Sequence, residues 1–492
     1  MNRDNPLELD PETMRRMGHR VVDLLVDRIA GLDKAPAWRG GDRATLRAEV
    51  GATPPDEPAD FDGLVAHLVD HVMPFAGAVD HPRFFAFIPS CPTWPGLLGD
   101  FLARGHSLFQ GTWLESAGPS TLELLVLDWF KQWIGYPPSA AGLLTSGGSA
   151  ANLDALVCAR SALLGPDDDP VIYMSTEAHS SMERAARIVG FRPDQVRRVP
   201  TDDGYRLRVD ALETAMAADR AAGRRPFLVV ANGGATSTGA VDPLRVLADR
   251  TRARDMWLHV DAAYGGFAVL TERGRRLLDG LGQADSVTLD PHKWLYQPFE
   301  AGCLLVREGH RLPDAFHIMP DYLQDTALRR ARDTRAGPDA HEVNFADRGL
   351  QLTRDTRAVK IWLSLRTFGL DAFRQGIDHA MDLAAAAEER IRSSQTLELL
   401  APASLGVVCF RRSAAMSGGP VPGDAGAGVA AEAELEGWNA KLVARLSESG
   451  VGMISSTRLN GQYALRLCVL NHRSGRDDME RVLSFLESEP VG

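Results

Sequence analysis

The segment Ser286-Val287-Thr288-Leu289-Asp290-Pro291-His292-Lys293-Trp294-Leu295 places a histidine and a lysine at the end of a short apolar strand. Val287 and Leu289 alternate with polar residues as they do in a strand, and Pro291 ends the pattern. Partial desolvation favours the neutral amine of a lysine, which can then attack a carbonyl and hold it as a Schiff base. Because lysines usually stay solvated, this segment alone is equally compatible with a loop lysine that lies beside Trp294.

Strands and helices alternate along the chain before this segment. We expect strands over residues 171–175, 227–231 and 256–264, a helix that starts at Ser180 and another over residues 244–254. Such alternation predicts a mostly parallel sheet with helices on both faces, and ligands bind at the carboxyl ends of the strands in sheets of this kind. Polar residues stand at these ends at five positions, which are His179, Asn232, Thr236, Asp261 and Lys293. One such residue is usually structural, but five together predict a functional site.

A glycine turn precedes the first helix of this region. The residues Thr145-Ser146-Gly147-Gly148-Ser149 lead from an apolar stretch into a helix expected over residues 150–164. Backbone N–H groups at a helix N-terminus bind anions, and the Ser149 hydroxyl can cap the helix or donate to a ligand. The turn favours a phosphate site only weakly, since similar turns are common as plain structure. It matches neither the glycine pattern of dinucleotide-binding proteins nor a Walker loop.

The composition is that of an ordinary globular protein. The 492 residues are 45% hydrophobic and 24% charged, with a net charge of −11, which disfavours a nucleic-acid partner. We find no secretory signal and no run of about 18 apolar residues, so we expect no membrane span. The five scattered cysteines are expected to be buried thiols without metal-ligand spacing, which favours a reducing compartment and a cytoplasmic protein: Cys91, Cys158, Cys303, Cys409 and Cys468.

The N-terminal region predicts an arm. A helix is expected from Pro11 to about Gly31, followed by an extended, proline-rich passage over residues 35–58. A helix whose next segment is extended cannot bury its apolar face locally. We expect the arm to pack on a partner subunit, although packing on its own main domain is the alternative.

A smaller α/β region is expected at the C-terminal end. A long helical segment over residues 370–393 precedes strands at 406–410 and 463–470 and helices at 435–449 and 477–487. Residues 413–431 are expected to form a flexible insertion, and residues 320–325 and 329–339 a mobile loop of the kind that can act as a lid. The predicted division is an arm of residues 1–85, a large domain of residues 86–370 and a small domain of residues 371–492.

The segments found so far resemble the pyridoxal-phosphate-dependent group II amino-acid decarboxylases, and most closely their aromatic-L-amino-acid decarboxylase branch. The likeness extends over nearly the whole chain. It rests on these motifs in this order: His81-Pro82 with Phe84-Phe85-Ala86, Gly147-Gly148-Ser149, Ala178-His179-Ser180-Ser181, His259-Val260-Asp261-Ala262-Ala263-Tyr264 and Asp290-Pro291-His292-Lys293-Trp294. The resemblance implies an α/β fold of fold type I, like that of aspartate aminotransferase, and a homodimer with active sites at the subunit interface.

The resemblance also implies a role for individual residues. Lys293 matches the lysine that holds pyridoxal phosphate covalently. Asp261 matches the carboxylate that keeps the pyridine nitrogen protonated, so that the ring accepts the electrons left at Cα after CO2 departs. His179 matches the imidazole stacked on the ring, and Tyr322 the loop tyrosine that delivers a proton to Cα. The remaining cofactor contacts implied are Ala263 beneath the ring, Thr236 near its substituents, and Gly148, Ser149 and His292 at the phosphate.

The predicted substrate pocket is apolar but differs from that of the animal aromatic enzymes. It comprises Phe87, Ile88, Ser90, Phe109, Gly111 and Trp113. Gly111 stands where the family often has a bulky phenyl side chain from the neighbouring subunit. Asp290 stands where asparagine is usual, and we expect it to contribute its backbone or to point its side chain away, because a carboxylate aimed at a phosphate would be repelled. The aromatic stretch over residues 81–90 is also compatible with a plain core strand.

Several functions stay open at this point. Decarboxylation of an aromatic L-amino acid to the amine is expected, and an oxygen-using aromatic aldehyde synthase on the same scaffold is the alternative. The synthase branch tends to replace the stacked histidine or the loop tyrosine, whereas His179 and Tyr322 are both present here. A decarboxylase of acidic substrates would need a cation, for which Arg83 is the candidate. A catalytically inactive scaffold is disfavoured because every chemical position is intact.

Overall fold

The computed structural model describes residues 5–51, 54–88, 91–318, 321, 325, 342–413 and 425–490. Its central feature is a seven-stranded sheet in the order β2-β8-β7-β6-β5-β3-β4, in which every strand except β8 runs in the same direction. The strands are β2 (Ala141–Thr145), β3 (Pro170–Ser175), β4 (Val196–Val199), β5 (Arg225–Asn232), β6 (Trp257–Asp261), β7 (Ser286–Leu289) and β8 (Gly302–Val306). The mostly parallel sheet is therefore confirmed.

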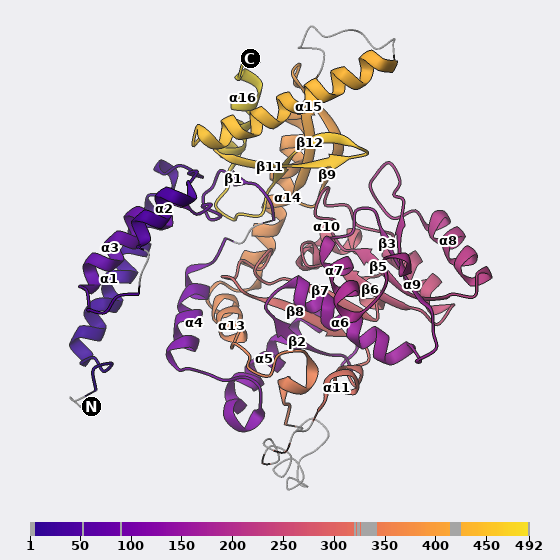
Figure 1. Ribbon diagram of the computed structural model, residues 1–492, viewed down its shortest axis with the longest axis horizontal. Helices are drawn as coiled ribbons and strands as arrows, with labels where there is room; N and C mark the ends of the chain where they lie inside the picture. Colours follow the sequence, from indigo (N-terminus) through magenta and orange to yellow (C-terminus); the bar gives the residue numbers. More distant parts are fainter. Residues whose placement is uncertain are drawn as a thin grey trace.

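Helices surround this sheet (Figure 1). Every residue of β3, β6, β7 and β8 is buried, as expected for central strands of a sheet that is covered on both faces. The helices of this layer are α5 (Trp113–Ile134), α6 (Gly148–Leu163), α7 (Ser180–Val189), α8 (Val209–Ala221), α9 (Leu244–Arg252), α10 (Glu272–Leu277) and α11 (Arg311–Phe316). No described helix of the chain is long and apolar enough to cross a membrane.

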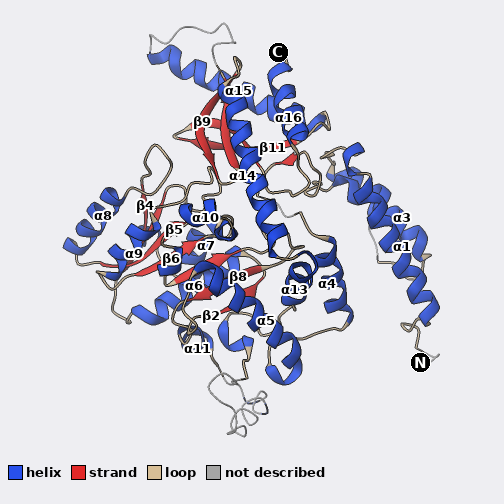
Figure 2. Cartoon of the chain, turned by 180° about the vertical axis from the view of Figure 1, so that it is seen from behind, coloured by secondary structure: helices blue, strands red, loops and turns tan. Residues whose placement is uncertain are grey.

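A second sheet of five strands lies beyond the first, visible as a separate set of arrows in Figure 2. Its order is β1-β11-β12-β10-β9, with β1 (Phe84–Phe85), β9 (Leu397–Ser404), β10 (Val407–Arg412), β11 (Met453–Leu459) and β12 (Gln462–Cys468). The helices α13 (Ala358–Phe368), α14 (Leu370–Arg392), α15 (Ala425–Glu448) and α16 (Arg476–Ser488) complete this half of the chain. Phe84 pairs with Met453, so the aromatic stretch contributes a very short strand to this sheet.

The N-terminal helices form the predicted arm, which extends along one side of the molecule (Figure 1). They are α1 (Pro11–Ala30), α2 (Arg43–Val50) and α3 (Phe61–His71). The next helix, α4 (Trp94–Gly105), follows the arm. Asp10 caps α1 as expected, and its carboxylate accepts the N–H of Glu12 and of Thr13. The passage over residues 35–58 was wrongly predicted to be extended throughout, because Asp42 caps α2 within it.

Some strands were not predicted. β4, β8, β9 and β11 are absent from the sequence prediction, and β6 ends at Asp261 instead of continuing to residue 264. β9 carries Pro402, which is a poor strand former, and β11 contains a polar Ser-Ser-Thr-Arg run. Pairing with neighbouring strands, and not local propensity, holds these strands in place: β9 pairs with β10 and β11 with β12 as hairpins, whereas β4 pairs with β3 and β8 with β2 and β7.

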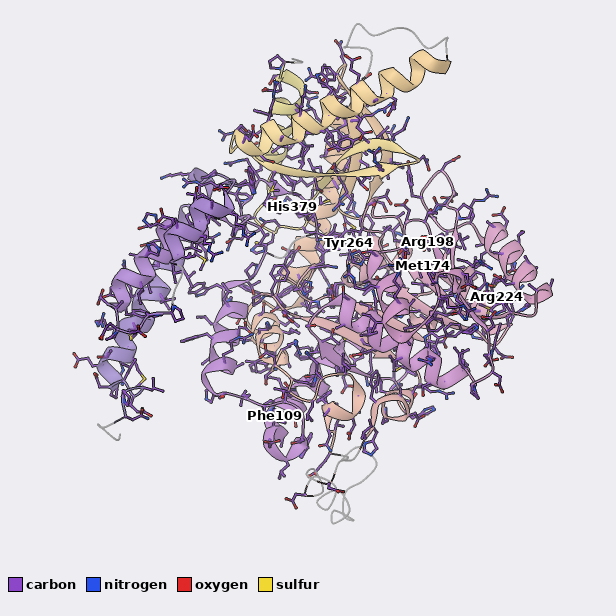
Figure 3. All side chains as sticks on the ribbon, in the orientation of Figure 1. Phe109, Met174, Arg198, Arg224, Tyr264 and His379 are labelled. Atoms are coloured by element: carbon purple, nitrogen blue, oxygen red, sulfur yellow. The ribbon has the colours of Figure 1, made fainter. Side chains whose placement is uncertain are left out.

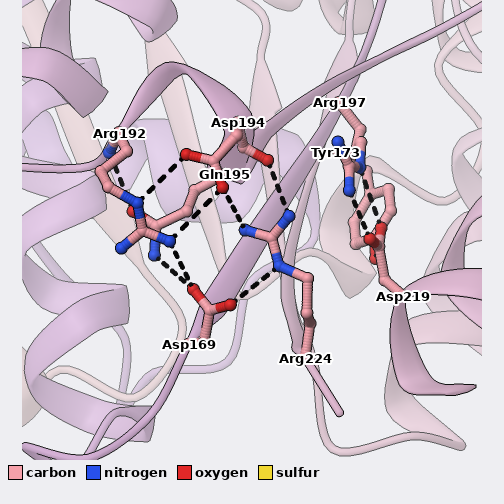
Figure 4. A network of polar contacts seen from close by, with 8 residues as sticks. All are labelled: Asp169, Tyr173, Arg192, Asp194, Gln195, Arg197, Asp219 and Arg224. Carbon is pink, nitrogen blue, oxygen red and sulfur yellow. Dashed lines mark hydrogen bonds and ion pairs between the residues drawn. The ribbon is translucent and has the colours of Figure 1, made fainter. Parts of the chain in front are cut away.

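The edge strand β4 is fixed by a network of ion pairs (Figure 4). Asp219 accepts a hydrogen bond from Tyr173 (2.8 Å) and two from the Arg197 guanidinium (3.1 and 2.6 Å). These contacts, with the hydrogen bonds from Arg197 first, lower the pKa of the Asp219 carboxyl. Next to them, Asp169 accepts a hydrogen bond from Arg192 (3.0 Å). The network protects the exposed edge of the sheet and leaves the carboxyl ends of the strands free for a site.

Candidate active site

The carboxyl ends of β5, β6 and β7 border a cavity of about 290 Å³. It lies between the glycine turn before α6, the start of α7 and the loop after β7. All five polar residues predicted at the strand ends line it, together with the other predicted cofactor contacts: Gly148, Ser149, His179, Asn232, Thr236, Asp261, Ala263, His292 and Lys293. The parallel topology therefore brings together residues from Gly148 to Lys293, because parallel strands end at one edge of the sheet.

Lys293 lies at the end of the loop after β7 and forms an ion pair with Asp290. Its Nζ is 3.0 Å from Asp290 Oδ2, and its side chain is 21% exposed. The expectation that Asp290 points away is wrong, because this carboxylate is 2% exposed and lines the cavity. The nearby Lys293 ammonium compensates the buried charge, which explains why the side chain turns inward.

His292 is held beside this ion pair. Its Nδ1 accepts the N–H of Ala301 (3.2 Å), and its Nε2 lies 3.5 Å from Asp290 Oδ2. Burial lowers the pKa of the His292 imidazole to about 4, although the Asp290 carboxylate opposes this change. The ring is therefore neutral at pH 7, with Nε2 as its N–H donor.

The glycine turn provides room and N–H donors. Gly147 has φ +156°, and α6 begins at Gly148. A Cβ on Gly148 would lie 3.0 Å from the Ala263 Cβ and 3.0 Å from Asp290 Oδ2. Glycine therefore keeps open the space between the helix N-terminus and the loop, where the N–H groups can bind an anion.

Asp261 ends β6 and is 9% exposed. Its Oδ1 accepts the N–H of Ala263 (3.2 Å), and its Oδ2 accepts a hydrogen bond from Asn152 Nδ2 (2.8 Å). Both bonds orient the carboxylate. A carboxylate held in this way can pair with a protonated ring nitrogen.

His179 caps α7 and lies at the more open side of the cavity. Its Nδ1 accepts the backbone N–H of Ser181 (3.3 Å) and lies 2.8 Å from Ser181 Oγ. Burial lowers the pKa of the His179 imidazole, and the Asp261 carboxylate opposes this change. A neutral ring with an acceptor at Nδ1 carries its proton at Nε2.

The predicted substrate pocket does not meet this cavity within one chain. None of its described members is among the residues that line the cavity: Phe87, Ile88, Phe109, Gly111 and Trp113. Phe109 lies well apart from the cavity residue Tyr264 in Figure 3, and the Trp113 N–H is bonded to Asn344 Oδ1 (2.9 Å). Ser90 and Tyr322 lie outside the described residues, as does most of the predicted lid.

Arg83 is also absent from the described lining of the cavity. Its Nε donates to the Val451 carbonyl (2.6 Å), its Nη2 donates to the Asp33 carbonyl (3.2 Å), and its Nη1 is 3.5 Å from Asp478 Oδ1. The guanidinium therefore joins the end of the arm to the second sheet. It is not free to bind a substrate.

Sequence reasoning missed Asn152, Ser181 and Tyr264 at the cavity. The Tyr264 hydroxyl accepts the N–H of Gly406 (2.7 Å), which connects the cavity wall to the start of β10. The sequence feature that could have identified Asn152 is its position four residues after Gly148, which places both residues on one face of the helix. The other buried residues of this helix are mostly small or apolar. A polar residue on such a face needs a buried partner.

Pyridoxal phosphate, the cofactor expected from the sequence, fits this donor set. The helix N-terminus at Gly148 and the Ser149 hydroxyl suit a phosphate, and Lys293 offers an amine to an aldehyde. Asp261 supplies a carboxylate for a pyridinium nitrogen. The space that a Cβ on Gly148 would fill indicates that a group can approach the backbone there.

The chain matches the model of the pyridoxal-dependent decarboxylase conserved domain over residues 44–413. It is 38% identical to an aromatic-L-amino-acid decarboxylase of Bacillus atrophaeus, with 98% of this chain and 96% of the relative covered. It is 29% identical to a phenylacetaldehyde synthase of Petunia hybrida, with 94% and 91% covered. The solved structure of Catharanthus roseus tryptophan decarboxylase in complex with L-tryptophan has a TM-score of 0.87 and 28% identity, and the match covers 98% of each chain. The chain therefore belongs to the pyridoxal-dependent decarboxylase family.

Proposed function

We propose that this enzyme converts aromatic L-amino acids to their amines and CO2 at the cavity described above. The observation that carries the proposal is the presence of Lys293, Asp261 and the glycine turn around one cavity. Pyridoxal phosphate, when bound, accepts the electron pair that departing CO2 leaves at Cα.

The residues of this chain hold and orient the reacting groups. Lys293 Nζ would hold the cofactor through its aldehyde carbon. Asp261 would keep a proton at the pyridine nitrogen, and the Ala263 methyl group would contact the ring. The His179 ring would stack on the cofactor ring, and its N–H at Nε2 would be available to the substrate carboxylate. Gly148, Ser149 and His292 would hold the phosphate, and Thr236 would contact the ring substituents.

An aromatic substrate is supported by two observations. The Bacillus relative is an aromatic-L-amino-acid decarboxylase, and the Catharanthus structure holds L-tryptophan. In addition, the only basic side chains among the described residues that line the cavity are His179, His292 and Lys293, all of which have roles above. Within this cavity, a second carboxylate on the substrate would therefore lack a cation.

A substrate panel tests this proposal. The enzyme is offered tryptophan, tyrosine, phenylalanine, DOPA, 5-hydroxytryptophan, glutamate, aspartate and cysteine sulfinate. We expect kcat/KM for the best aromatic substrate to exceed that for the acidic ones at least about a hundredfold, since burying an unpaired carboxylate costs several kcal/mol. Glutamate reacting faster than all the aromatic substrates would contradict the proposal.

The same reactions separate the amine from the aldehyde product. CO2, amine, aldehyde and peroxide are measured with oxygen present and absent. We expect one amine for each CO2 in both conditions, because His179 is retained and the amine pathway consumes no oxygen. Stoichiometric peroxide and an oxygen requirement for the carbonyl product would instead indicate the aldehyde synthase reaction, the activity named in the Petunia relative.

We propose that the chain divides into an arm of residues 1–85, a large domain of residues 86–370 and a small domain of residues 371–492. The seven strands of the large sheet fall within residues 141–306, and β9 to β12 fall within residues 397–468. The end of the arm reaches the second sheet through the pairing of Phe84 with Met453.

We also propose that the enzyme is a homodimer in which the arm packs on the partner. No residue of α1, all of which the structure describes, is buried, although Val21, Leu25 and Val26 are apolar. Leu64 and Leu68 of α3 are exposed as well. Contiguous exposed apolar side chains indicate an interface. A partner chain also accounts for the distance of Phe109 from the cavity of its own chain, since that residue could line the partner's site.

Leu25→Glu tests the dimer. We expect the wild-type enzyme to sediment at twice the chain mass, and the variant to shift to the monomer and to lose at least about tenfold in activity, because a charge on this face must be desolvated in the interface. Val246→Glu is the matched control, because Val246 is similarly exposed, at 42%, on α9 of the main body. A wild-type monomer with full activity would rule the proposal out.

A further inference from the structure

Asn152 uses its whole hydrogen-bonding capacity next to the cavity. The residue is 1% exposed, and its Nδ2 lies 2.8 Å from Asp261 Oδ2 and 2.9 Å from Ser181 Oγ. Its Oδ1 accepts from Thr288 Oγ1 (2.7 Å) and lies 3.0 Å from His259 Nε2. A primary amide offers two N–H donors and two acceptor lone pairs, so all four are engaged.

The residues behind Asn152 fix the direction of these bonds. The Trp257 indole can only donate, and it donates to Ser286 Oγ (2.8 Å). The Ser286 hydroxyl therefore donates its own hydrogen to His259 Nδ1, which is 2.8 Å away. His259 then carries its proton at Nε2 and donates it to Asn152 Oδ1. Burial lowers the pKa of the His259 imidazole to about 4, which keeps the ring neutral.

The bonds in front of Asn152 follow from this direction. The Asp261 carboxylate can only accept, so Asn152 Nδ2 donates one hydrogen to it and the other to Ser181 Oγ. The Ser181 hydroxyl hydrogen then points to His179 Nδ1, 2.8 Å away. One amide thus connects the carboxylate at the base of the cavity with the imidazole at its open side.

We propose that Asn152 is a positioning residue that sets the orientation and charge of Asp261 and, through Ser181, the tautomer of His179. The inference rests on the function proposed above for these two side chains and deepens it. Asn152 itself need not touch the cofactor ring. Its effect arises because two N–H groups on one rigid amide fix two acceptors at once.

Asn152→Asp is the decisive variant. The substitution nearly preserves the shape and keeps an oxygen for His259 and Thr288, but it removes both donated hydrogens and places a carboxylate beside Asp261. We expect the Kd of pyridoxal phosphate, titrated by absorbance into cofactor-free protein at pH 8, to rise at least about tenfold, since like charges this close disfavour ionisation. The ratio of the variant Kd to the wild-type Kd should fall as the pH is lowered to 6, because a proton shared by the two carboxylates restores one donor. The other titratable groups that face this region are the same in both proteins, namely His179, His259, Asp290 and Lys293. Their effect on the cofactor Kd therefore largely cancels in the ratio.

Ser181→Ala cuts only the branch to His179. We expect it to leave the cofactor Kd within about twofold of the wild type, because Asn152 still donates to Asp261. The ¹⁵N chemical shifts of the His179 ring, assigned by their loss in His179→Gln, should move toward a mixture of the two tautomers, because only the longer bond from the Ser181 backbone N–H (3.3 Å) then still favours the proton at Nε2. Unchanged shifts in Ser181→Ala would overturn the tautomer part of the proposal.

Thr288→Val is the stability control. It removes a hydrogen bond to Asn152 Oδ1 and leaves both donors of Nδ2 in place. The positioning role is rejected if Thr288→Val lowers the melting temperature as much as Asn152→Asp does and weakens cofactor binding equally. It is also rejected if Asn152→Asp binds the cofactor with the wild-type Kd. These readouts need no turnover, so they remain distinct from failure of the enzyme to form an amine.

Discussion

Lys293→Ala is expected to abolish the covalent attachment of pyridoxal phosphate and to lower turnover by at least about a thousandfold, because no other amine is placed to bind the aldehyde in the described cavity. The visible absorbance of the bound cofactor should disappear. Borohydride treatment followed by peptide mapping should find the reduced cofactor on Lys293 in the wild type and on no lysine in the variant.

The control for this substitution is Lys34→Ala, which removes an exposed lysine of the arm. It should keep the wild-type spectrum and rate. Borohydride-stable labelling that persists in Lys293→Ala would mean that a different lysine holds the cofactor. Circular dichroism tests whether the variant is folded. We expect an unchanged spectrum, because Lys293 contacts Asp290 at the cavity and is not part of the hydrophobic core.

The cofactor side of the site could be predicted from the sequence because it depends on topology. Parallel strands end at one edge, so His179, Asp261 and Lys293 had to meet once the alternation of strands and helices was recognised. The glycine turn was equally visible, because a helix begins directly after it. These features follow from the hydrophobic periodicity of the sequence and from the positions of its glycine and proline residues.

Other features depend on contacts that a sequence does not reveal. Asp290 turns inward because the Lys293 ammonium is 3.0 Å away, and the expectation of repulsion by a phosphate neglected that partner. Asn152 was missed because its four partners come from α7, β6 and β7, which are far apart in sequence. α2 was missed because its cap, Asp42, lies in a proline-rich passage.

The substrate side could not be derived from one chain. Phe109, Gly111 and Trp113 are near the segment that starts at residue 342, as the bonds of Ala346 to Gly111 and of Trp113 to Asn344 indicate. In the proposed homodimer, a second chain would explain why these residues lie apart from the cavity of their own chain. The homodimer remains a proposal that the Leu25 variant tests.

Asp261→Asn is the second variant with a large expected effect. The amide has nearly the size of the carboxylate, and the Ala263 N–H can still donate to its oxygen. It offers no negative charge to a pyridinium nitrogen, however, so the ring nitrogen loses its proton more readily and becomes a weaker electron acceptor. Asn152 Nδ2 would also face an N–H group unless the new amide rotates, which adds a loss of orientation.

We expect Asp261→Asn to lower the single-turnover rate of CO2 release by about a thousandfold, comparable to the loss of other preorganised electrostatic groups, and to weaken cofactor binding. Asp255→Asn is the matched control, because Asp255 is an exposed carboxylate just before β6. Both variants should keep the wild-type circular dichroism. A single-turnover rate near that of the wild type in Asp261→Asn, with the cofactor bound, would show that the carboxylate only fills space. The charge on Asp261 would then have no part in the loss of CO2, and the hydrogen bond from Asn152 would serve stability alone.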